Sequence, residues 1–113
     1  MRTFTVMVLL LIVLATGQPA SAANFEDNRF SDTILTNNIS RGTSMVFAPD
    51  GRLFILEQGG DLLIYENGAL LNSSALSLDV DSRGERGLLG LAFDPNFTVN
   101  NHVYIYYTPD ATP

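Results

Sequence analysis

The chain has 113 residues, with six basic and twelve acidic side chains and a net charge of −6. It contains no lysine, and its arginines are scattered, which excludes the clustered positive charge that nucleic acids and anionic membranes require. It contains no cysteine, so no disulfide can stabilise it. A packed core must hold the fold, and the length suffices for one small domain.

Residues 1–22 have the pattern of a secretory signal peptide. Arg2 supplies the positive charge, residues 4–16 form a largely apolar stretch, and Ala20-Ser21-Ala22 fits the small-residue cleavage site. A membrane anchor is the alternative, but a spanning helix needs roughly 18 or more apolar residues. We therefore predict a mature N-terminus at Ala23, no membrane span after cleavage, and a secreted or periplasmic location. Loss of Arg2 leaves five basic against twelve acidic groups, a net charge of −7.

Residues 23–43 are polar and irregular, and they read as a lead-in segment. After them the apolar pattern takes a period of two. Glycine-containing turns separate four apolar runs, which lie at residues 45–47, 53–56, 62–65 and 76–80. One turn is Asn67-Gly68, the strongest short hairpin signal. The pattern predicts an antiparallel four-stranded meander over about Ser44–Val80, the unit from which propeller blades are built.

The pattern then restarts. The run Met45-Val46-Phe47-Ala48-Pro49-Asp50 has a counterpart 46 residues later in Leu91-Ala92-Phe93-Asp94-Pro95-Asn96, and residues 53–56 have one in residues 103–107. A repeat of ~40–50 residues with four strands is what a propeller blade predicts. A small all-β sandwich with two similar turns is the alternative. Neither interpretation includes a helix of useful length between residues 41 and 107.

Alternation within these runs predicts a core. We expect it to contain Phe47, Phe54, Ile55, Leu63, Ile64, Leu78, Leu89, Leu91, Phe93, Tyr104 and Ile105. The tyrosines around residues 104–107 are expected to pack within the sheet rather than to form a platform for a sugar.

The most informative stretch is residues 84–97, where Gly84, Gly87 and Gly90 lie three residues apart around an acid and a base. It closely resembles the first-blade signature of the glucose/sorbosone dehydrogenase family, the soluble quinoprotein sugar dehydrogenases. The resemblance covers about Thr36–Thr108. It implies a six-bladed β-propeller that carries pyrroloquinoline quinone and calcium. We therefore expect residues 44–113 to form the first blade and the start of the second, as the N-terminal piece of a longer protein or a truncated gene product.

Glu85 and Arg86 are the candidate cofactor-binding residues. In sugar-oxidising members of the resembled family, a polar residue of this turn faces the central cavity and contacts cofactor and substrate. It is typically Gln, in a Gly-Gln-Asn-Gly-Leu-Leu-Gly setting, and Glu85 takes its place here. An ionised carboxylate only accepts hydrogen bonds, and it would repel the anionic quinone unless Arg86 or calcium offset its charge. The alternative is an exposed Glu85–Arg86 pair worth about 0–1 kcal/mol.

No catalytic or metal-ligating residue is assigned. Asp79-Val80-Asp81 opens like a calcium loop, but Arg83 and Gly90 occupy positions where that loop needs ligands. His102 is the single histidine, and it does not match the position of the family's catalytic histidine, which follows the first blade.

The resemblance implies an exported enzyme that oxidises a sugar hydroxyl by hydride transfer to the quinone. The alternative is an exported, non-catalytic interaction module, because hedgehog-interacting proteins share this propeller and the Glu-Arg-Gly-Leu-Leu turn and bind protein. Since the family's general base and most of its cofactor contacts come from later blades, we expect the mature chain alone to be inactive. Its unpaired blade faces are expected to make it self-associate.

Overall fold

The computed structural model describes residues 29–111. The predicted signal peptide lies outside these residues. The chain divides into a unit that ends at Thr33 and a larger unit over residues 34–113. Residues 29–33 contain neither helix nor strand. No helix within residues 29–111 has the length and apolar character to span a membrane.

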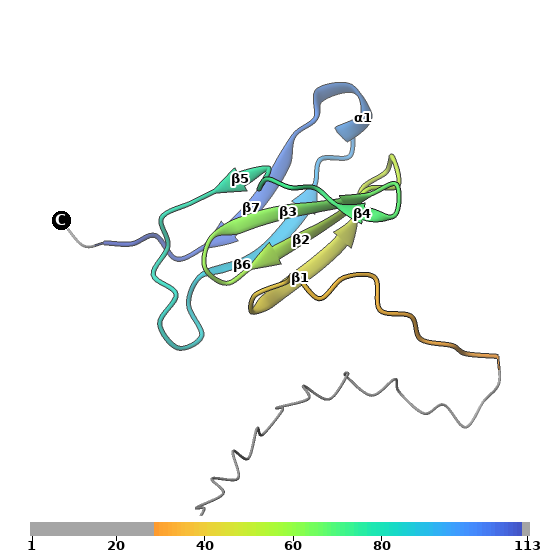
Figure 1. Ribbon diagram of the computed structural model, residues 1–113. Helices are drawn as coiled ribbons and strands as arrows, with labels where there is room; N and C mark the ends of the chain where they lie inside the picture. The colour runs from red at the N-terminus through yellow and green to blue at the C-terminus, as the bar shows by residue number, and fades with distance from the viewer. Residues whose placement is uncertain (1–28, 112–113) are drawn as a thin grey trace, which may run out of the picture. The chain divides into compact units, whose positions relative to one another are not determined.

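The larger unit begins with a five-stranded antiparallel sheet (Figure 1). Its strands are β1 (Gly42–Phe47), β2 (Leu53–Glu57), β3 (Asp61–Glu66), β4 (Ala69–Leu70) and β5 (Leu76–Ser77). The strands β1, β2, β3 and β4 follow one another across the sheet, and β5 also pairs with β3. The tight turns after β1 and β3 place Gly51 and Gly68 at positive φ, which glycine adopts readily.

The predicted meander is confirmed for its first three strands, but the prediction of a single fourth strand over residues 76–80 is wrong. Two short strands replace the single run over residues 76–80: β4 pairs with the end of β3 and β5 with its beginning. The exposed polar residues 72–74 between them supply no apolar face to continue a strand. Val80 instead forms an isolated bridge with Pro109.

The second sheet has two antiparallel strands, β6 (Leu88–Phe93) and β7 (Val103–Tyr107). Their connection contains the one-turn helix α1 (Phe97–Asn100), which ends at Asn101 in a left-handed conformation. No longer helix is present between residues 41 and 107. The restart of the strand pattern after residue 88 is therefore confirmed.

Asp94 organises that connection. Its carboxylate accepts hydrogen bonds from the Tyr104 hydroxyl at 2.6 Å, the Asn96 backbone N–H at 2.8 Å and the Asn100 amide at 3.0 Å. These donors, Tyr104 first among them, lower the pKa of Asp94 to about 2. The sequence Asp-Pro-Asn therefore forms a hydrogen-bonded turn rather than a simple hairpin.

The core lies between the two sheets. It consists of Ala48, Phe54, Leu56, Leu62, Ile64, Leu88 and Phe97. The rings of Phe54, Phe93 and Phe97 meet edge to face, with centroids 5.0 Å apart for the first pair and 4.7 Å for the last pair. Such aromatic pairs add about 0.5–1.5 kcal/mol each beyond the buried area. The two sheets are thus one packed structure.

Several predicted core residues are confirmed. Phe54, Ile55 and Ile64 are buried, and Leu78, Leu91, Phe93 and Ile105 pack partly buried against the core. Leu63 and Leu89 are only partly buried. The prediction that Phe47 and Tyr104 belong to the core is wrong, because their side chains have exposed fractions of 68% and 58%. Both lie on sheet faces that no other described sheet covers.

These observations define an all-β fold of stacked antiparallel sheets. The arrangement is consistent with part of a propeller, in which blades pack face to face. The sheets form no closed barrel within the described residues.

Candidate functional site

The glycine turn lies in the connection between β5 and β6 (Figure 1). Gly84 has φ 60° and Gly87 has φ 132°, both in the region that disfavours L side chains. Gly90 lies inside β6 without positive φ, so its position does not require glycine for backbone conformation. Two of the three evenly spaced glycines therefore adopt backbone conformations that favour glycine.

Gln58 docks this turn onto the first sheet. Its side chain is buried, and its amide nitrogen donates hydrogen bonds to the carbonyl oxygens of Gly84 and Arg86, each at 2.7 Å. The backbone N–H of Leu88 donates in turn to the carbonyl oxygen of Gln58 at 3.2 Å. A Cβ at Gly87 would lie 2.3 Å from that same oxygen, so only glycine fits there.

Two further hydrogen bonds hold the end of the turn. The Thr43 hydroxyl, from β1, donates to the Leu88 carbonyl at 2.7 Å. The Thr108 backbone N–H, just after β7, donates to the Gly87 carbonyl at 2.9 Å. The turn is therefore tied to both sheets at once.

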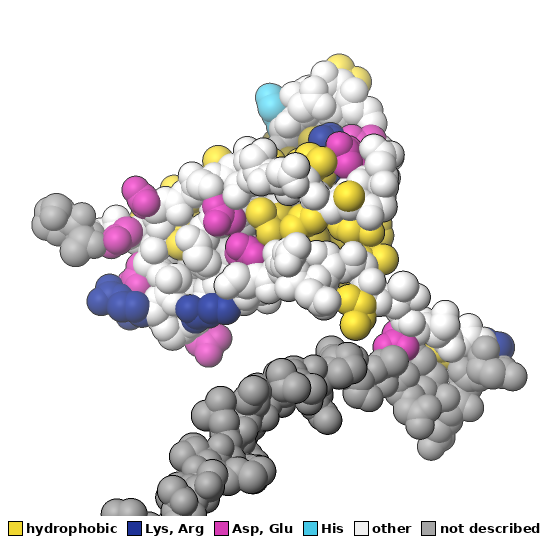
Figure 2. Space-filling view, in the orientation of Figure 1, with side chains coloured by type: hydrophobic (Ala, Val, Ile, Leu, Met, Phe, Trp, Pro, Cys, Tyr) yellow, Lys and Arg dark blue, Asp and Glu magenta, His cyan; other side chains and the backbone are white. Residues whose placement is uncertain are grey.

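Asp81 gathers the two arginines of the turn region. Arg83 binds its carboxylate with two nitrogens, at 2.8 and 2.9 Å, and Arg86 binds the same carboxylate. The guanidinium groups hold the pKa of Asp81 well below its usual range. Figure 2 shows positive side chains beside acidic ones over the region of the connection that precedes β6. Asp81 is thus an ion-pair partner rather than a free metal ligand.

The structure separates the two candidate residues. Arg86 pairs with Asp81 and not with Glu85, so the alternative of an exposed Glu85–Arg86 pair is wrong. Glu85 is exposed, and its side chain makes no hydrogen bond or ion pair with the other described residues. Its carboxylate is therefore available to a ligand, whereas the guanidinium of Arg86 is partly engaged.

His102 is exposed and lies directly before β7. Within residues 29–111, no three side chains of His, Cys, Asp or Glu gather as ligands for a metal ion.

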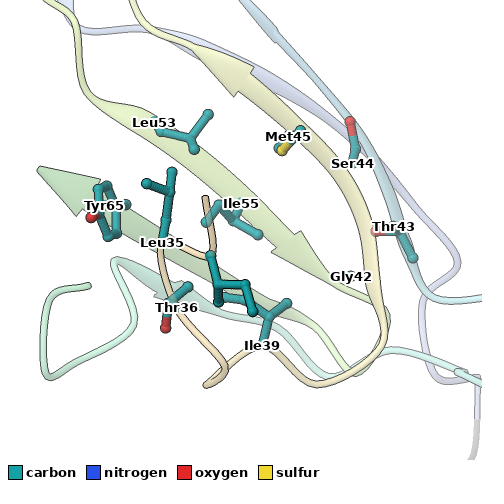
Figure 3. A pocket seen from close by; sticks show the side chains of 11 residues that line it. Leu35, Thr36, Ile39, Gly42, Thr43, Ser44, Met45, Leu53, Ile55 and Tyr65 are labelled. Carbon is teal, nitrogen blue, oxygen red and sulfur yellow. The ribbon is translucent and has the colours of Figure 1, made fainter. Parts of the chain in front are cut away.

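A separate groove of about 540 Å³ lies on the outer face of the first sheet (Figure 3). The lead-in residues Leu35 and Ile39 lie beside Ile55 of β2, and Met45 and Tyr65 complete the walls. The lining residues carry no charge and include none of the glycine turn. The groove is mainly apolar, and the hydroxyls of Thr36, Thr43, Ser44 and Tyr65 are its polar side-chain groups.

Comparison with known proteins identifies the class. The family Glucose / Sorbosone dehydrogenase matches residues 39–112. The chain belongs to this family.

Individual relatives agree with that assignment. Quinoprotein glucose dehydrogenase B of Acinetobacter calcoaceticus is 25% identical over 91 residues, which cover 77% of this chain and 19% of the relative. The hedgehog-interacting protein of Mus musculus is 35% identical over 81 residues, which cover 64% of this chain and 12% of the relative. The chain therefore spans about a fifth or less of these relatives.

A solved structure also matches. It is a candidate oxidoreductase (glucose dehydrogenase) from Thermus thermophilus, 36% identical, with a TM-score of 0.61. The match covers 67% of this chain and 23% of that chain. The likeness therefore extends to the backbone structure as well as to the sequence.

Sequence reasoning missed Gln58. It stands in a Gln-Gly-Gly-Asp turn, where a glutamine reads as ordinary turn composition. Only the three-dimensional approach of residues 84–88 to this turn reveals its role. No sequence pattern in this single chain indicated that contact.

Proposed function

We propose that this chain supplies the N-terminal part of an exported quinoprotein sugar dehydrogenase. In this proposal, residues 44–113 form the first blade and the start of the second blade of a six-bladed β-propeller. The observation that carries the proposal is the family match over residues 39–112, which includes the glycine turn that Gln58 docks. The full enzyme would oxidise a sugar hydroxyl by hydride transfer to pyrroloquinoline quinone.

The chain's own contribution would be the Gly84–Gly87 turn. Glu85 presents an exposed carboxylate with no hydrogen-bond or ion-pair partner among residues 29–111, and this group can accept hydrogen bonds from sugar hydroxyls. Arg86 can offset the negative charge of the quinone carboxylates, although Asp81 already shares its guanidinium. Glu85 and Arg86 could therefore contact a quinone and a sugar from one side of the site. Removal of the sugar hydroxyl proton would require a general base outside the described residues.

An exported interaction module is the second candidate. The observation that favours it is Glu85, which stands where sugar-oxidising members carry Gln, together with the match to the hedgehog-interacting protein. In that case the exposed Glu85 would contact a protein partner.

Export is part of both proposals. The pattern of residues 1–22 supports cleavage after Ala22 and a secreted or periplasmic mature chain. Mass spectrometry of the exported protein should find Ala23 at the N-terminus. An intact Met1 in a membrane fraction would contradict this proposal.

Two experiments separate the candidates. Titration of the whole gene product with pyrroloquinoline quinone and calcium should show saturable quinone binding if it is a dehydrogenase, and none if it is an interaction module. Coding DNA beyond the codon for Pro113 gives an independent answer. Further blades with a histidine-bearing turn favour the enzyme, and blades without that histidine favour the module.

A further inference from the structure

The geometry around residue 58 points to a positioning residue, and we propose that Gln58 sets the conformation in which the turn presents Glu85 and Arg86. The link to quinone rests on the proposed function above. The link to the turn rests on contacts in this chain alone.

The first support is the placement of the two hydrogen bonds. A glutamine amide has two N–H donors, and the nitrogen of Gln58 lies 2.7 Å from the carbonyl oxygens of both Gly84 and Arg86. These carbonyls belong to the residues directly before and after Glu85. The amide therefore fixes the backbone on each side of the exposed carboxylate.

The second support is burial. Gln58 is 8% exposed, and among the described residues its side chain is the one polar side chain that is buried. Buried polar groups persist where their hydrogen bonds are satisfied. Because the backbone of Gln58 also accepts from Leu88 and closely approaches Gly87, main chain and side chain grip the same turn.

The third support is what other side chains would do at this position. Methionine has a similar length but no donor, so both carbonyls would lose their partner. Glutamate at neutral pH would place an acceptor against two acceptors. Protonated glutamate regains one donor, and its burial beside carbonyl oxygens raises its pKa. The Gln58→Glu variant should therefore respond to pH in a way that a packing defect would not.

The test measures amide hydrogen exchange in the mature chain. In Gln58→Met, the amides of Arg86 and Leu88 should exchange about tenfold faster, while that of Ile64 in β3 stays unchanged. In Gln58→Glu, their exchange relative to the wild-type chain should slow again as the pH falls from 7 to 5. The matched control is Glu66→Gln at the far end of β3, which should change none of these amides.

Failure would be visible in two separate ways. Unchanged exchange at Arg86 and Leu88 in Gln58→Met, or no recovery of Gln58→Glu in acid, would overturn the positioning role. Quinone affinity of the whole gene product supplies the second readout, with about a tenfold weakening expected for Gln58→Met. If the wild-type product binds quinone and Gln58→Met binds it equally well, the link to the cofactor is wrong. If the wild-type product binds none, the proposed function fails while the exchange result still decides the role in the turn.

Discussion

The two sheets carry the same side-chain pattern but bury it differently. Phe47 ends β1 and Phe93 ends β6, and they occupy equivalent positions of the repeat. Phe93 packs against Phe54 of the first sheet, with their ring centroids 5.0 Å apart, whereas Phe47 is 68% exposed. The register agrees with this equivalence, because Phe47 pairs with Leu53 and Phe93 with Val103.

The opposite faces show the same relation. Val46 and Phe54 face the second sheet and help to form the interface between the sheets. Their counterparts Ala92 and Tyr104 lie on the free face of the second sheet, where Tyr104 is 58% exposed. The face that is exposed in one sheet is therefore equivalent to the face that is buried in the other sheet. The strand pattern therefore sets which way a side chain points, and the presence of a neighbouring sheet decides whether that side chain is buried.

The largest expected effect is a difference in stability between alanine variants of the two equivalent phenylalanines. Phe93→Ala should lower the free energy of unfolding by about 3 kcal/mol, because it removes a ring packed between Phe54 and Phe97. Phe47→Ala should lower it by less than about 1 kcal/mol, since most of that ring already contacts solvent. Urea unfolding of the mature chain measures both. Equal losses would show that the two positions are not differently buried.

Two glycines sharpen the contrast at the junction of the sheets. Gly87→Ala should destabilise the chain by about 2 kcal/mol, since its Cβ meets the Gln58 carbonyl and its φ is positive. Gly90→Ala is the matched control, because the nearest atom to its Cβ is Tyr106 Cβ at 3.6 Å, an ordinary contact. Its effect should stay within about 0.5 kcal/mol. A Gly90→Ala loss as large as that of Gly87→Ala would refute the close approach at Gln58.

The free faces should make the mature chain self-associate. Met45 and Phe47 on one sheet and Tyr106 on the other are 68–72% exposed, a large apolar area for so small a domain. The double variant Met45→Ser with Phe47→Ser should raise the dissociation constant about tenfold, as measured by sedimentation. The exposed Val99→Ser, on α1, serves as control. A strictly monomeric wild-type chain would contradict this expectation.

The smallest expected effect is a loss of folding stability at low pH that depends on Asp94. Hydrogen bonds lower the pKa of Asp94 to about 2, so its ionised form stabilises the fold above the unfolded value of about 4. That contribution is lost as the pH falls from about 4 to 2. Asp94→Asn, which cannot titrate, should flatten this part of the stability profile. An unchanged profile in thermal melts from pH 5 to 2 would show that Asp94 does not contribute.

The sequence predicted three strands of the first sheet and both strands of the second, because alternation and glycine turns are local signals. It did not predict the split of the fourth strand, since the polar residues 72–74 carry no alternating pattern that would show where pairing stops. It placed Phe47 and Tyr104 in the core because alternation cannot reveal whether a neighbouring sheet is present. At the candidate site, the motif predicted Glu85 and Arg86 as cofactor-binding residues, and that role stays a prediction. Their separation by Asp81, and the role of Gln58, depend on contacts 5 to 28 residues apart in the chain.

One assay tests the central claim, that this chain is one part of a composite quinone site. Purified monomeric residues 23–113 and the whole gene product would be compared in dye-linked oxidation of aldoses with quinone and calcium. We predict turnover by the whole product that depends on quinone, and none by residues 23–113. Turnover by the verified monomer, or a folded whole product that neither binds quinone nor oxidises any sugar, would contradict the account.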